Sequence, residues 1–527
     1  MGVFFGEVRV GRFIMIKIEN IKLPVTAGFD EVYEECLKRA KIKRGSVKHF
    51  KILKKSLDAR DKTDLKFVYS AEISDRKEKE AVFTVPEYKG GGNTVITGFG
   101  PAGMFCALYL ARAGYKPIVI ERGLDADNRK KSLDKFINDK ILDENSNIQF
   151  GEGGAGTFSD GKLNSGVSGE LTRTVLKDLV SFGAPKEIEW EAKPHVGSDR
   201  LPTVVKNIRR EIERLGGKVM FSTTLTGFKS KSGKIVSAIT NRGEIECERL
   251  VLAVGHSARD TFSSLLSSGI TIEPKPFAVG LRIEHLQREI SVSQYGEKFA
   301  SLLGSADYRL ASRKGNRGVF TFCMCPGGYV TASSSETGGV VTNGMSLYDR
   351  NGENANSAVL CEVYPSDFPV GALGGVELQR KIEKSAFLLG GSDYSAPVQT
   401  VKDFLEGNLT TKLGRVRPTY PIGYKFADLN ELFIKDISDN IKSGIVDMGN
   451  KLKGFSDGEA VLTGAETRSS SPVRIIRGEN FESLSMENLY PCGEGCGYAG
   501  GIMSAAIDGI KVAYQIGKKS NERIYNL

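Results

Sequence analysis

A β-branched apolar run leads directly into a cluster of glycines at Thr94-Val95-Ile96-Thr97-Gly98-Phe99-Gly100-Pro101-Ala102-Gly103. The glycines follow the spacing Gly-x-Gly-x-x-Gly, and each position has its own physical use. Gly98 permits a tight turn, Gly100 lets a phosphate approach the backbone, and Gly103 lets a helix pack closely on the strand. The run therefore predicts a strand, a phosphate-binding turn and the start of a helix.

A helix and a second strand complete this unit. Residues 104–113 are apolar and are followed by Gly114, which predicts a helix ended by a glycine cap. Its N-terminus offers free N–H groups and the positive end of its dipole to phosphates. Residues 117–121 predict a strand ending in Glu121, whose carboxylate can accept hydrogen bonds from both hydroxyls of a ribose. The whole unit predicts a dinucleotide site, and the carboxylate disfavours the 2′-phosphate of NADP.

Two later segments favour FAD over NAD as the dinucleotide. Residues 250–255 (LVLAVG) predict a strand ending in a small-residue turn, and residues 489–502 predict a strand, a glycine turn and a helix start. A flavoprotein returns its chain so that an acidic residue and a helix N-terminus meet the cofactor, whereas a plain NAD domain needs no such return. The residues expected at the cofactor are Ala253, Gly255, Gly493, Glu494, Gly500, Gly501 and Ile502.

The chain resembles a bacterial family of FAD-dependent dehydrogenases, sometimes called NAD(FAD)-utilising dehydrogenases. The matching segments are 150–163 (FGEGGAGTFSDGKL), 276–285 (PFAVGLRIEH), 322–328 (FCMCPGG), 464–474 (GAETRSSSPVR) and 492–502 (CGEGCGYAGGI). The resemblance covers nearly the whole chain beyond residue 14. It implies FAD, a glutathione-reductase-like FAD domain and an inserted second domain, but it names no substrate.

The resemblance also implies roles for individual residues. The residues that match pyrophosphate and ribose contacts are Gly98, Gly100, Gly103, Glu121 and Arg122. The residues implied to offer backbone N–H groups near pyrophosphate and flavin are Gly153, Gly154, Ala155, Gly156 and Thr157. Lys162 either neutralises a phosphate or is a surface lysine. Glu494 stands where related flavoproteins often have Asp against the ribityl chain.

We expect an α/β plus α+β protein with three parts. A Rossmann-like FAD/NAD(P)-binding domain receives an inserted mixed α+β domain and follows a small N-terminal α+β domain of ferredoxin-like type. The expected boundaries are 1–89 for the N-terminal domain, 90–275 and 480–527 for the FAD domain, and 276–479 for the insert. The elements expected in the first domain are strands over 14–18, 48–53 and 65–73 and a helix over 30–40, with a flexible link at 89–92.

Charge is concentrated near the N-terminus. The 527 residues carry a net charge of +9, and residues 36–66 hold 12 Lys or Arg against 3 Asp or Glu. Such a module can contact nucleic acid, an acidic protein or an anionic cofactor, or it can be a solvated basic face.

The sequence also bears on location. It holds no apolar run of the roughly 18 residues that a membrane span needs. Residues 1–17 lack a signal-peptide layout, and Met15 is an alternative start to Met1. Eight cysteines are too few in so long a chain for a disulfide framework, so we expect a cytoplasmic protein without a membrane partner.

Histidines are candidates for the catalytic base. His256 directly follows the turn at Gly255, and His285 lies in the family-like segment 276–285. Imidazole suits a base that must act near neutral pH, although a single histidine is often a packing residue. His195 is a weaker candidate of the same kind.

Two pairs of cysteines raise the question of thiol chemistry. Cys323 and Cys325 form one pair and are candidates for catalysis, and Cys492 and Cys496 form the other. Thiols beside a flavin can exchange electrons with it, while packing and metal binding are the alternatives. Neither spacing is a zinc pattern and the chain has four His, so we expect no metal site. Only Cys106 follows the first glycine motif, which disfavours the Cys-x4-Cys chemistry of disulfide reductases.

Substrate and electron partners are less defined by the sequence. The arginines that can pair with an anionic substrate are Arg415, Arg417, Arg468 and Arg474. No second Gly-x-Gly-x-x-Gly unit is present, so a dedicated NAD(P)H domain is not expected, although nicotinamide can bind transiently over the flavin. The oligomeric state stays open.

We expect an FAD-dependent oxidoreductase that transfers a hydride between a small organic substrate and N5 of the flavin. An RNA-modifying flavoprotein that uses the basic N-terminal domain is one alternative, with nucleic acid as a less favoured partner. A flavin-binding sensor or interaction protein without turnover is the other.

Overall fold

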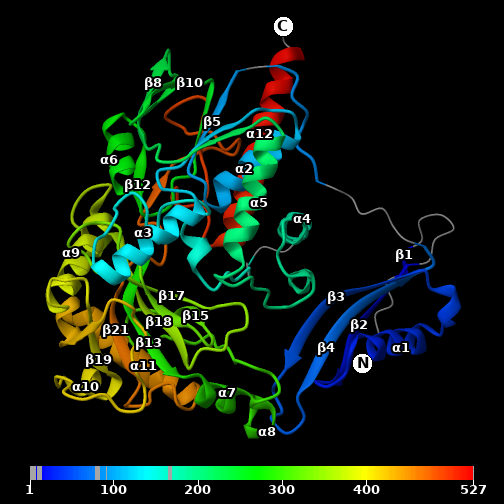
Figure 1. The fold of residues 1–527 in the computed structure, drawn as a ribbon, viewed down its shortest axis with the longest axis vertical. Coiled ribbons are helices and arrows are strands. Elements are labelled where there is room, and N and C mark those ends of the chain that lie inside the picture. Colours follow the sequence, from blue (N-terminus) through cyan, green and yellow to red (C-terminus); the bar gives the residue numbers. More distant parts are fainter. Residues whose placement is uncertain are drawn as a thin grey trace.

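A computed structural model of the chain describes residues 7–8, 15–76, 83–90, 92–163, 166 and 169–525. Residues 1–6 and 9–14 and Gly91 lie outside these ranges, so the expectations about the chain start and about that linker glycine concern undescribed residues. Figure 1 shows a small N-terminal domain beside two larger layers, which are built on a five-stranded and a seven-stranded sheet.

The N-terminal domain is a four-stranded antiparallel sheet with one long helix. Its strand order is β1 (Glu7–Val8), β2 (Met15–Pro24), β4 (Lys66–Ser74) and β3 (His49–Asp58). Helix α1 (Phe29–Ala40) buries Val32 and Cys36 against the sheet. β2 and β3 flank β4 and are joined through α1, which is the split β-α-β arrangement of ferredoxin-like folds. That fold also requires a second α-helix, and residues 15–76 contain only α1 and the 3-10 turn η1 (Arg44–Ser46), so this part of the expectation is wrong.

The second layer has the predicted Rossmann-like topology. Its parallel sheet has the order β23 (Leu489–Pro491), β11 (Arg249–Leu252), β5 (Thr94–Thr97), β6 (Ile118–Ile120) and β7 (Lys218–Met220). β5 is central because β6 and β11 lie on its two sides. β23 pairs in parallel with β11, so the C-terminal segment does return to the sheet that holds the glycine turn.

Helix α2 (Pro101–Arg112) is the buried support of the glycine turn. Every residue from Ala102 to Ala111 is buried, as expected for a helix that is apolar all round. α5 (Leu201–Arg214) and α12 (Ile502–Tyr525) pack beside it (Figure 1). Gly509 allows the close approach of α12, because a Cβ there would lie 2.1 Å from the carbonyl oxygen of Ala102.

Smaller elements surround this sheet. An antiparallel sheet of β10 (Gly243–Glu246), β9 (Lys234–Thr240) and β8 (Leu225–Lys231) bridges β7 and β11 along the chain, and β8 was not predicted. The other helices of the two larger layers are α3 (Ala126–Asp139), α4 (Glu170–Ser181), α6 (Arg259–Ser267), α7 (Gln287–Tyr295), α8 (Glu297–Ala300), α9 (Gly374–Leu389), α10 (Val401–Glu406) and α11 (Lys435–Lys451).

The third layer is a mixed sheet within the expected insert. Its strand order is β14 (Ala311–Ser312), β15 (Val319–Cys325), β18 (Asn354–Val363), β13 (Phe277–Leu286), β21 (Val461–Glu466), β19 (Ala396–Thr400) and β20 (Tyr424–Phe426). A separate two-stranded sheet joins β16 (Tyr329–Ala332) to β17 (Thr342–Met345). β12 (Ile272–Pro274) pairs antiparallel with β22 (Val473–Ile475), so the chain enters and leaves this layer side by side.

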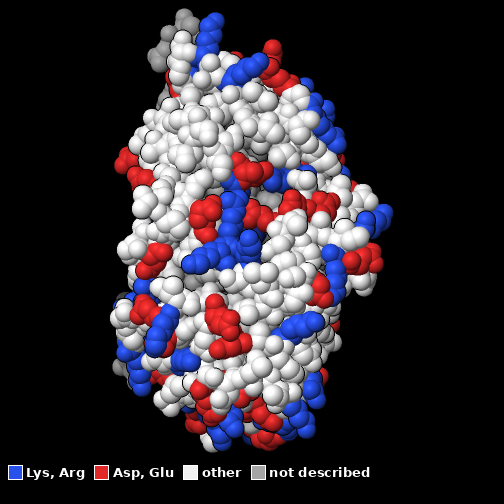
Figure 2. Space-filling model, turned by 90° about the vertical axis from the view of Figure 1, so that its left-hand side faces the viewer, with Lys and Arg blue, Asp and Glu red and all other residues white. Residues whose placement is uncertain are grey.

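The N-terminal domain contacts the FAD domain through the edge of its sheet. The N–H of Lys55 on β3 donates to the carbonyl of Trp190 at 2.7 Å, and the N–H of Ala192 donates back to Lys55 at 2.9 Å. Among the described residues, no helix is both long and apolar enough to cross a membrane. On the face of the molecule in Figure 2, one cluster of Lys and Arg lies in the middle with acidic residues around it.

Candidate functional site

A long cavity lies at the carboxyl ends of β5, β6 and β11, where open α/β sheets bind ligands. Its empty space, including the opening to solvent, is about 1520 Å³. One side belongs to the FAD domain, with the glycine turn and the start of α12. The other side belongs to the insert, with β15, β17 and the segment after β21.

The glycine turn has the shape that a pyrophosphate requires. A Cβ on Gly98, where φ is +95°, would lie 2.3 Å from the carbonyl oxygen of Ala253, and one on Gly103 would lie 2.0 Å from that of Gly98. A Cβ on Gly100 would instead come no closer than 3.8 Å to any protein atom outside its chain neighbours, the nearest being Cα of Gly154. Gly98 and Gly103 are therefore needed by the fold, because a side chain at either position would collide with the backbone. Gly100 borders free space at the N-terminus of α2.

Glu121 is buried at the end of β6 and is held by three backbone groups. Its carboxylate accepts the N–H groups of Phe99 at 2.7 Å and of Gly123 and Gly151 at 2.9 Å. A carboxylate has about four acceptor sites. Three of these sites are used by the backbone, so little capacity is left for the two ribose hydroxyls that Glu121 was expected to bind.

Most residues predicted at the cofactor come together around this cavity. Those that line it are Gly98, Gly100, Pro101, Ala102, Glu121, Arg122, Gly154, Ala155, Gly156, Lys162, Ala253, Gly255, Glu494, Gly500, Gly501 and Ile502. Those that do not are Phe99, Gly103, Gly153, Thr157 and Gly493. Phe99 donates its N–H to the carboxylate of Glu121, and Gly103 packs closely against the carbonyl of Gly98.

Three of the predicted backbone donors are used inside the protein. The N–H of Gly153 donates to the carbonyl of Phe99 at 2.9 Å, that of Gly154 to the carbonyl of Gly151 at 2.9 Å, and that of Thr157 to the carbonyl of Gly154 at 3.3 Å. The expectation that these three residues offer N–H groups to pyrophosphate or flavin is therefore wrong. Gly493, which was expected at the cofactor, donates its N–H to the carboxylate of Asp508 at 2.8 Å.

The two predicted cations at the cavity are both anchored. Arg122 pairs with Asp260 at 2.6 Å and lies over the ring of Phe150, 4.6 Å from its centroid. The ammonium of Lys162 donates to the carbonyl of Met324 on the insert. Lys162 is thus a half-buried link between the two walls and not a surface lysine.

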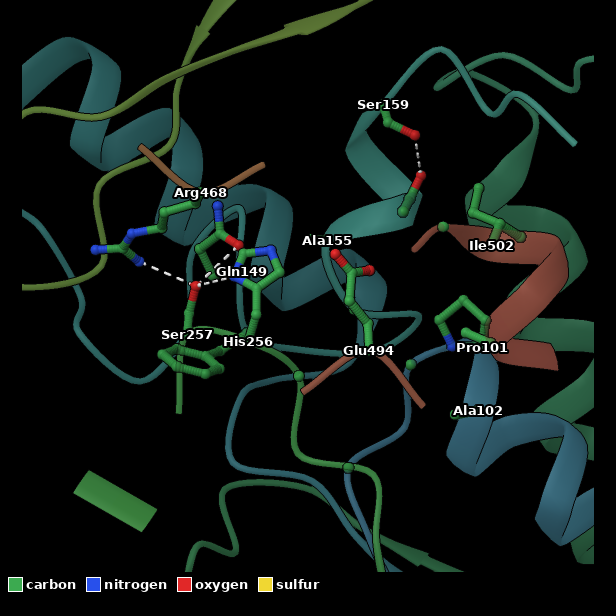
Figure 3. Close-up of a pocket in the computed structure, with 18 of the residues that line it drawn as sticks. Pro101, Ala102, Gln149, Ala155, Ser159, His256, Ser257, Arg468, Glu494 and Ile502 are labelled. Atoms are coloured by element: carbon green, nitrogen blue, oxygen red, sulfur yellow. Dashed lines mark hydrogen bonds between the residues drawn. The ribbon is translucent and has the colours of Figure 1, made fainter. Parts of the chain in front are cut away.

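His256 borders the cavity in a network of neutral and charged partners. Its Nδ1 is 3.1 Å from Oγ of Ser257, which also lies 3.2 Å from Oε1 of Gln149 and accepts Nη1 of Arg468 at 3.0 Å (Figure 3). Burial, with Arg468 and Arg259 nearby, lowers the pKa of His256 to about 3. The imidazole is therefore neutral at neutral pH. The sequence did not single out Gln149 or Ser257, although Gln149 directly precedes the family-like segment 150–163 and Ser257 directly follows His256.

Arg468 does not offer its guanidinium to a substrate. Its Nε and Nη2 pair with the two carboxylate oxygens of Glu383 at 3.0 Å, and Nη1 contacts Ser257 and Ser335. Glu383 also pairs with Arg259 at 2.7 Å. Bidentate binding of an anion by Arg468 is therefore excluded by its partners.

The other predicted arginines lie away from the cavity. Arg415 is held by Glu289, Asp457 and Glu459 on the surface, and neither it nor Arg417 nor Arg474 contributes to the lining. These three arginines, named as able to pair with an anionic substrate, are therefore not placed to do so in this cavity.

His285 is a packing residue. It is buried on β13, its Nε2 is 2.7 Å from the carbonyl oxygen of Phe455, and its ring packs on Phe455 and Tyr308. It does not line the cavity, so its assignment as a catalytic base is wrong. His195 is likewise outside, stacked on Tyr348 and bonded to its carbonyl.

Cys323 and Cys325 do line the cavity, from the insert side. Of the eight cysteines, all free, Cys323 is the one that is exposed. Cys325 is buried, and burial raises its pKa to about 11, so it is a thiol and not a thiolate at neutral pH.

Of the second cysteine pair, one residue lines the cavity and the other does not. Cys492 lines the cavity, but Cys496 does not and its Sγ donates to the carbonyl of Leu252 at 3.1 Å. Burial raises the pKa of both thiols. Within the described ranges, no group of three His, Cys, Asp or Glu could hold a metal ion.

Glu494 projects from the glycine turn before α12. Figure 3 shows it between His256 on one side and Pro101 on the other. Burial raises the pKa of Glu494 to about 7, against an opposing effect of Lys275. The carboxyl group can therefore be protonated or ionised near neutral pH.

Three family descriptions match successive parts of the chain. Residues 92–271 match "Pyridine nucleotide-disulphide oxidoreductase", residues 276–469 match "FAD-dependent protein, C-terminal domain-like", and residues 15–74 match "Domain of unknown function (DUF8436)". A protein of Clostridium beijerinckii, named only "Uncharacterized protein", is 46% identical over 526 residues, which are 96% of this chain and 99% of that protein.

Several solved flavoenzyme-like structures are similar at a low level. Glycine oxidase from Bacillus cereus is 11% identical, with 81% of this chain and 96% of that chain covered and a TM-score of 0.31. L-Proline dehydrogenase from P. horikoshii is 14% identical, with 84% and 94% covered and a TM-score of 0.31. CtdE in complex with FAD is 12% identical, with 83% and 93% covered and a TM-score of 0.29. Scores this low carry no argument about the present chain.

Proposed function

The chain belongs to a family of FAD-dependent oxidoreductases, and we propose that it exchanges electrons with a small organic molecule bound between its FAD domain and its insert. FAD is its cofactor. The observation that carries the proposal is that one cavity joins the glycine turn of the FAD domain to β15 and β17 of the insert. Clefts between two domains are usual places for a substrate to meet a cofactor.

The residues of the FAD domain fit the polar parts of the cofactor. Gly100 and the N-terminus of α2 would hold the pyrophosphate, and Glu121 would accept a hydrogen bond from the adenosine ribose. Glu494 would contact the ribityl chain. When bound, FAD supplies a ring that accepts or gives a hydride, while the protein supplies orientation and electrostatics.

The insert would face the flavin ring and the substrate. Lys162 is bonded to Met324, so the segment that follows η2 (Ala155–Phe158) lies against β15 at one end of the cavity. The wall residues of the insert are Phe322, Cys323, Met324, Cys325, Asn343, Gly344, Arg468 and Ser469. Arg468 is the charged one among them, and its guanidinium is already paired with Glu383. This wall therefore favours a molecule recognised by apolar contacts and hydrogen bonds over one held by arginine.

His256 is the remaining catalytic candidate among the histidines. It is neutral and borders the cavity, and Ser257 has a single hydroxyl proton to give to either Nδ1 or Gln149. When that proton goes to Gln149, Nδ1–H of His256 donates to Ser257 and Nε2 is left as an acceptor. Because the pKa of His256 is about 3, its role would be to accept a hydrogen bond at Nε2 from the substrate or the flavin, and not to take up a proton.

The test is whether substrates reduce the bound flavin. The purified full-length protein is expected to be yellow, and anaerobic addition of NADH, NADPH or fractionated metabolites is expected to bleach the flavin with at least one donor. A flavin that stays oxidised with every donor, although dithionite reduces it, would contradict an enzyme and favour a sensor. A colourless protein that cannot take up FAD would contradict the site itself.

A further inference from the structure

A two-residue bulge in β15 forms the part of the insert wall that carries Cys323. β15 pairs with β18 in register up to Phe322, opposite Ala358, and resumes at Cys325, opposite Asn356. Cys323 and Met324 therefore stand opposite a single residue of β18. Cys323 has a φ of +40°, a left-handed conformation that is unfavourable for a residue with a side chain. Bulges re-aim side chains beside active sites, and here the bulge exposes Cys323 to the cavity.

Arg282 is fully buried on β13 and donates a hydrogen bond to the backbone of this bulge. Its Nη1 donates to the carbonyl of Cys323 at 3.0 Å and to Oδ1 of Asn356 at 2.8 Å. Nε and Nη2 each donate to Glu466 at 2.6 Å, and Nη2 also donates to Asn343 at 3.4 Å. A guanidinium has five N–H groups, so every donor of Arg282 has an acceptor.

These acceptors come from four strands that do not all belong to one sheet. Cys323 is on β15, Asn356 on β18 and Glu466 on β21 of the seven-stranded sheet, while Asn343 is on β17 of the separate two-stranded sheet. Arg282 therefore links the part of the insert wall on β15 to the part on β17 through hydrogen bonds from one guanidinium. Gly344 makes room for it, because a Cβ there would lie 2.3 Å from Nη1 of Arg282.

We propose that Arg282 is a positioning residue of the active site: through its saturated guanidinium it fixes Cys323 and Asn343 in the wall that faces the flavin ring and the substrate. The facing role rests on the proposed function, whereas the hold on Cys323 is a property of the protein alone. Glu466 orients the guanidinium and balances its charge, since a single buried cation would be costly.

The geometry predicts a measurable effect on the thiol of Cys323. Without the hydrogen bond from Arg282, its backbone can relax from the left-handed region toward an extended conformation that turns the thiol away from the cavity. Arg282→Lys keeps a cation beside Glu466 but has three donors instead of five. Gly344→Ala keeps Arg282, but its Cβ would lie 2.3 Å from Nη1 of Arg282 and 2.4 Å from Oδ1 of Asn356, so it disturbs the hydrogen bonds that Nη1 makes. Both variants are expected to slow alkylation of Cys323 by about tenfold, as the loss of one hydrogen bond of ordinary strength allows.

The experiment measures iodoacetamide labelling of Cys323 in the full chain by peptide mass spectrometry, with and without added FAD. Arg317→Lys is the matched control, because the guanidinium of Arg317 forms a similar two-point ion pair with Asp367 in the insert, whereas its other partners, Asp436 and Glu362, do not line the cavity. It should label like wild type. Thermal melting and the visible circular dichroism of bound FAD are recorded for each variant, and the dichroism is expected to change in Arg282→Lys and not in Arg317→Lys.

The outcomes separate this proposal from the proposed function. Labelling of Cys323 that stays at the wild-type rate, or rises, in both folded variants overturns the positioning role of Arg282. If Arg282→Lys does not fold, Gly344→Ala decides alone. Labelling that slows in the variants while FAD gives no protection to the wild-type thiol supports the hold of Arg282 but contradicts FAD at this wall.

Discussion

Arg468 and Glu383 form a buried bidentate ion pair, with Nε 3.0 Å from one carboxylate oxygen and Nη2 3.0 Å from the other. The same carboxylate pairs with Arg259, which lies on α6 of the FAD domain, while Glu383 lies on α9 of the insert. One glutamate therefore joins the two domains and, through Arg468, positions Ser257 at the cavity.

Replacing Glu383 should cost far more stability than replacing an exposed neighbour. Glu383→Gln leaves the buried guanidinium of Arg468 without a carboxylate and that of Arg259 with Glu336 alone, and we expect the free energy of unfolding to fall by about 3–5 kcal/mol. Glu377→Gln is the control on the same helix, because Glu377 pairs with Arg380 at an exposed site. It should cost under about 1 kcal/mol. Urea unfolding measures both, and similar losses would contradict the central role of Glu383.

Substitutions of Gly100 and Gly103 by valine should both impair the protein, but for different physical reasons. Gly100→Val places its side chain in free space at the end of α2, so the FAD-free protein should melt like wild type but purify without yellow colour. Gly103→Val drives its Cβ into the carbonyl of Gly98, so this variant should lose thermal stability as well. Visible absorbance and melting curves distinguish them. A yellow Gly100→Val protein would show that the pyrophosphate does not lie at this turn.

The sequence could predict the FAD half of the site because its signals are local. Gly98, Gly100 and Glu121 lie within one β-α-β unit, where spacing alone fixes their relative positions. The pairing of β23 with β11 is distant in sequence, yet the glycine turn at 493–501 marks it. Helix α5 (Leu201–Arg214) carries a local signal of the same kind, because its buried apolar residues recur with a helical period.

The sequence did single out Cys323 and Cys325 of the insert, which line the cavity. The contacts that hold the insert half together could not be predicted, because they are distant in sequence and carry no spacing signal. Arg282 and Glu466 are 184 residues apart, and Arg259 and Glu383 are 124 apart. His285 looked like a base because histidine suits that task, but β13 turns it toward Phe455. Gly153 and Thr157 were placed correctly near the turn, but their N–H groups were already used by Phe99 and Gly154.

Glu494 should make FAD affinity depend on pH near neutrality. Its pKa is raised to about 7, so ionisation above that pH places a negative charge in the cavity that also takes the pyrophosphate. We expect the Kd for FAD to rise between about pH 6 and pH 8, since the carboxylate would repel the phosphates. Glu494→Gln should flatten this dependence. Fluorescence titration of FAD into the FAD-free protein measures it, and an unchanged pH profile in the variant would exclude Glu494 as the titrating group.

The same group affects the stability of the FAD-free protein with a defined sign. Its folded pKa of about 7 lies above the value of about 4.3 expected in the unfolded chain. The contribution of Glu494 is therefore fully present below about pH 4 and is lost as the pH rises toward 7. Glu494→Gln should remove this decline in urea unfolding. A decline of equal size in the variant would assign it to other groups.

His285 should influence acid stability and leave flavin chemistry unchanged. Burial lowers its pKa to about 4, against about 6.5 in an unfolded chain. The neutral ring therefore contributes stability above about pH 6.5 that is lost as the pH falls toward 4, by up to about 3 kcal/mol. His285→Gln keeps an N–H for the carbonyl of Phe455 but does not titrate. The free energy of unfolding of this variant, measured with urea, should therefore fall less steeply as the pH is lowered.

His256→Gln is the matched comparison, since His256 borders the cavity. This change should alter the rate of flavin reduction, whereas His285→Gln should not. Slow reduction in His285→Gln with a normal rate in His256→Gln would reverse the two assignments.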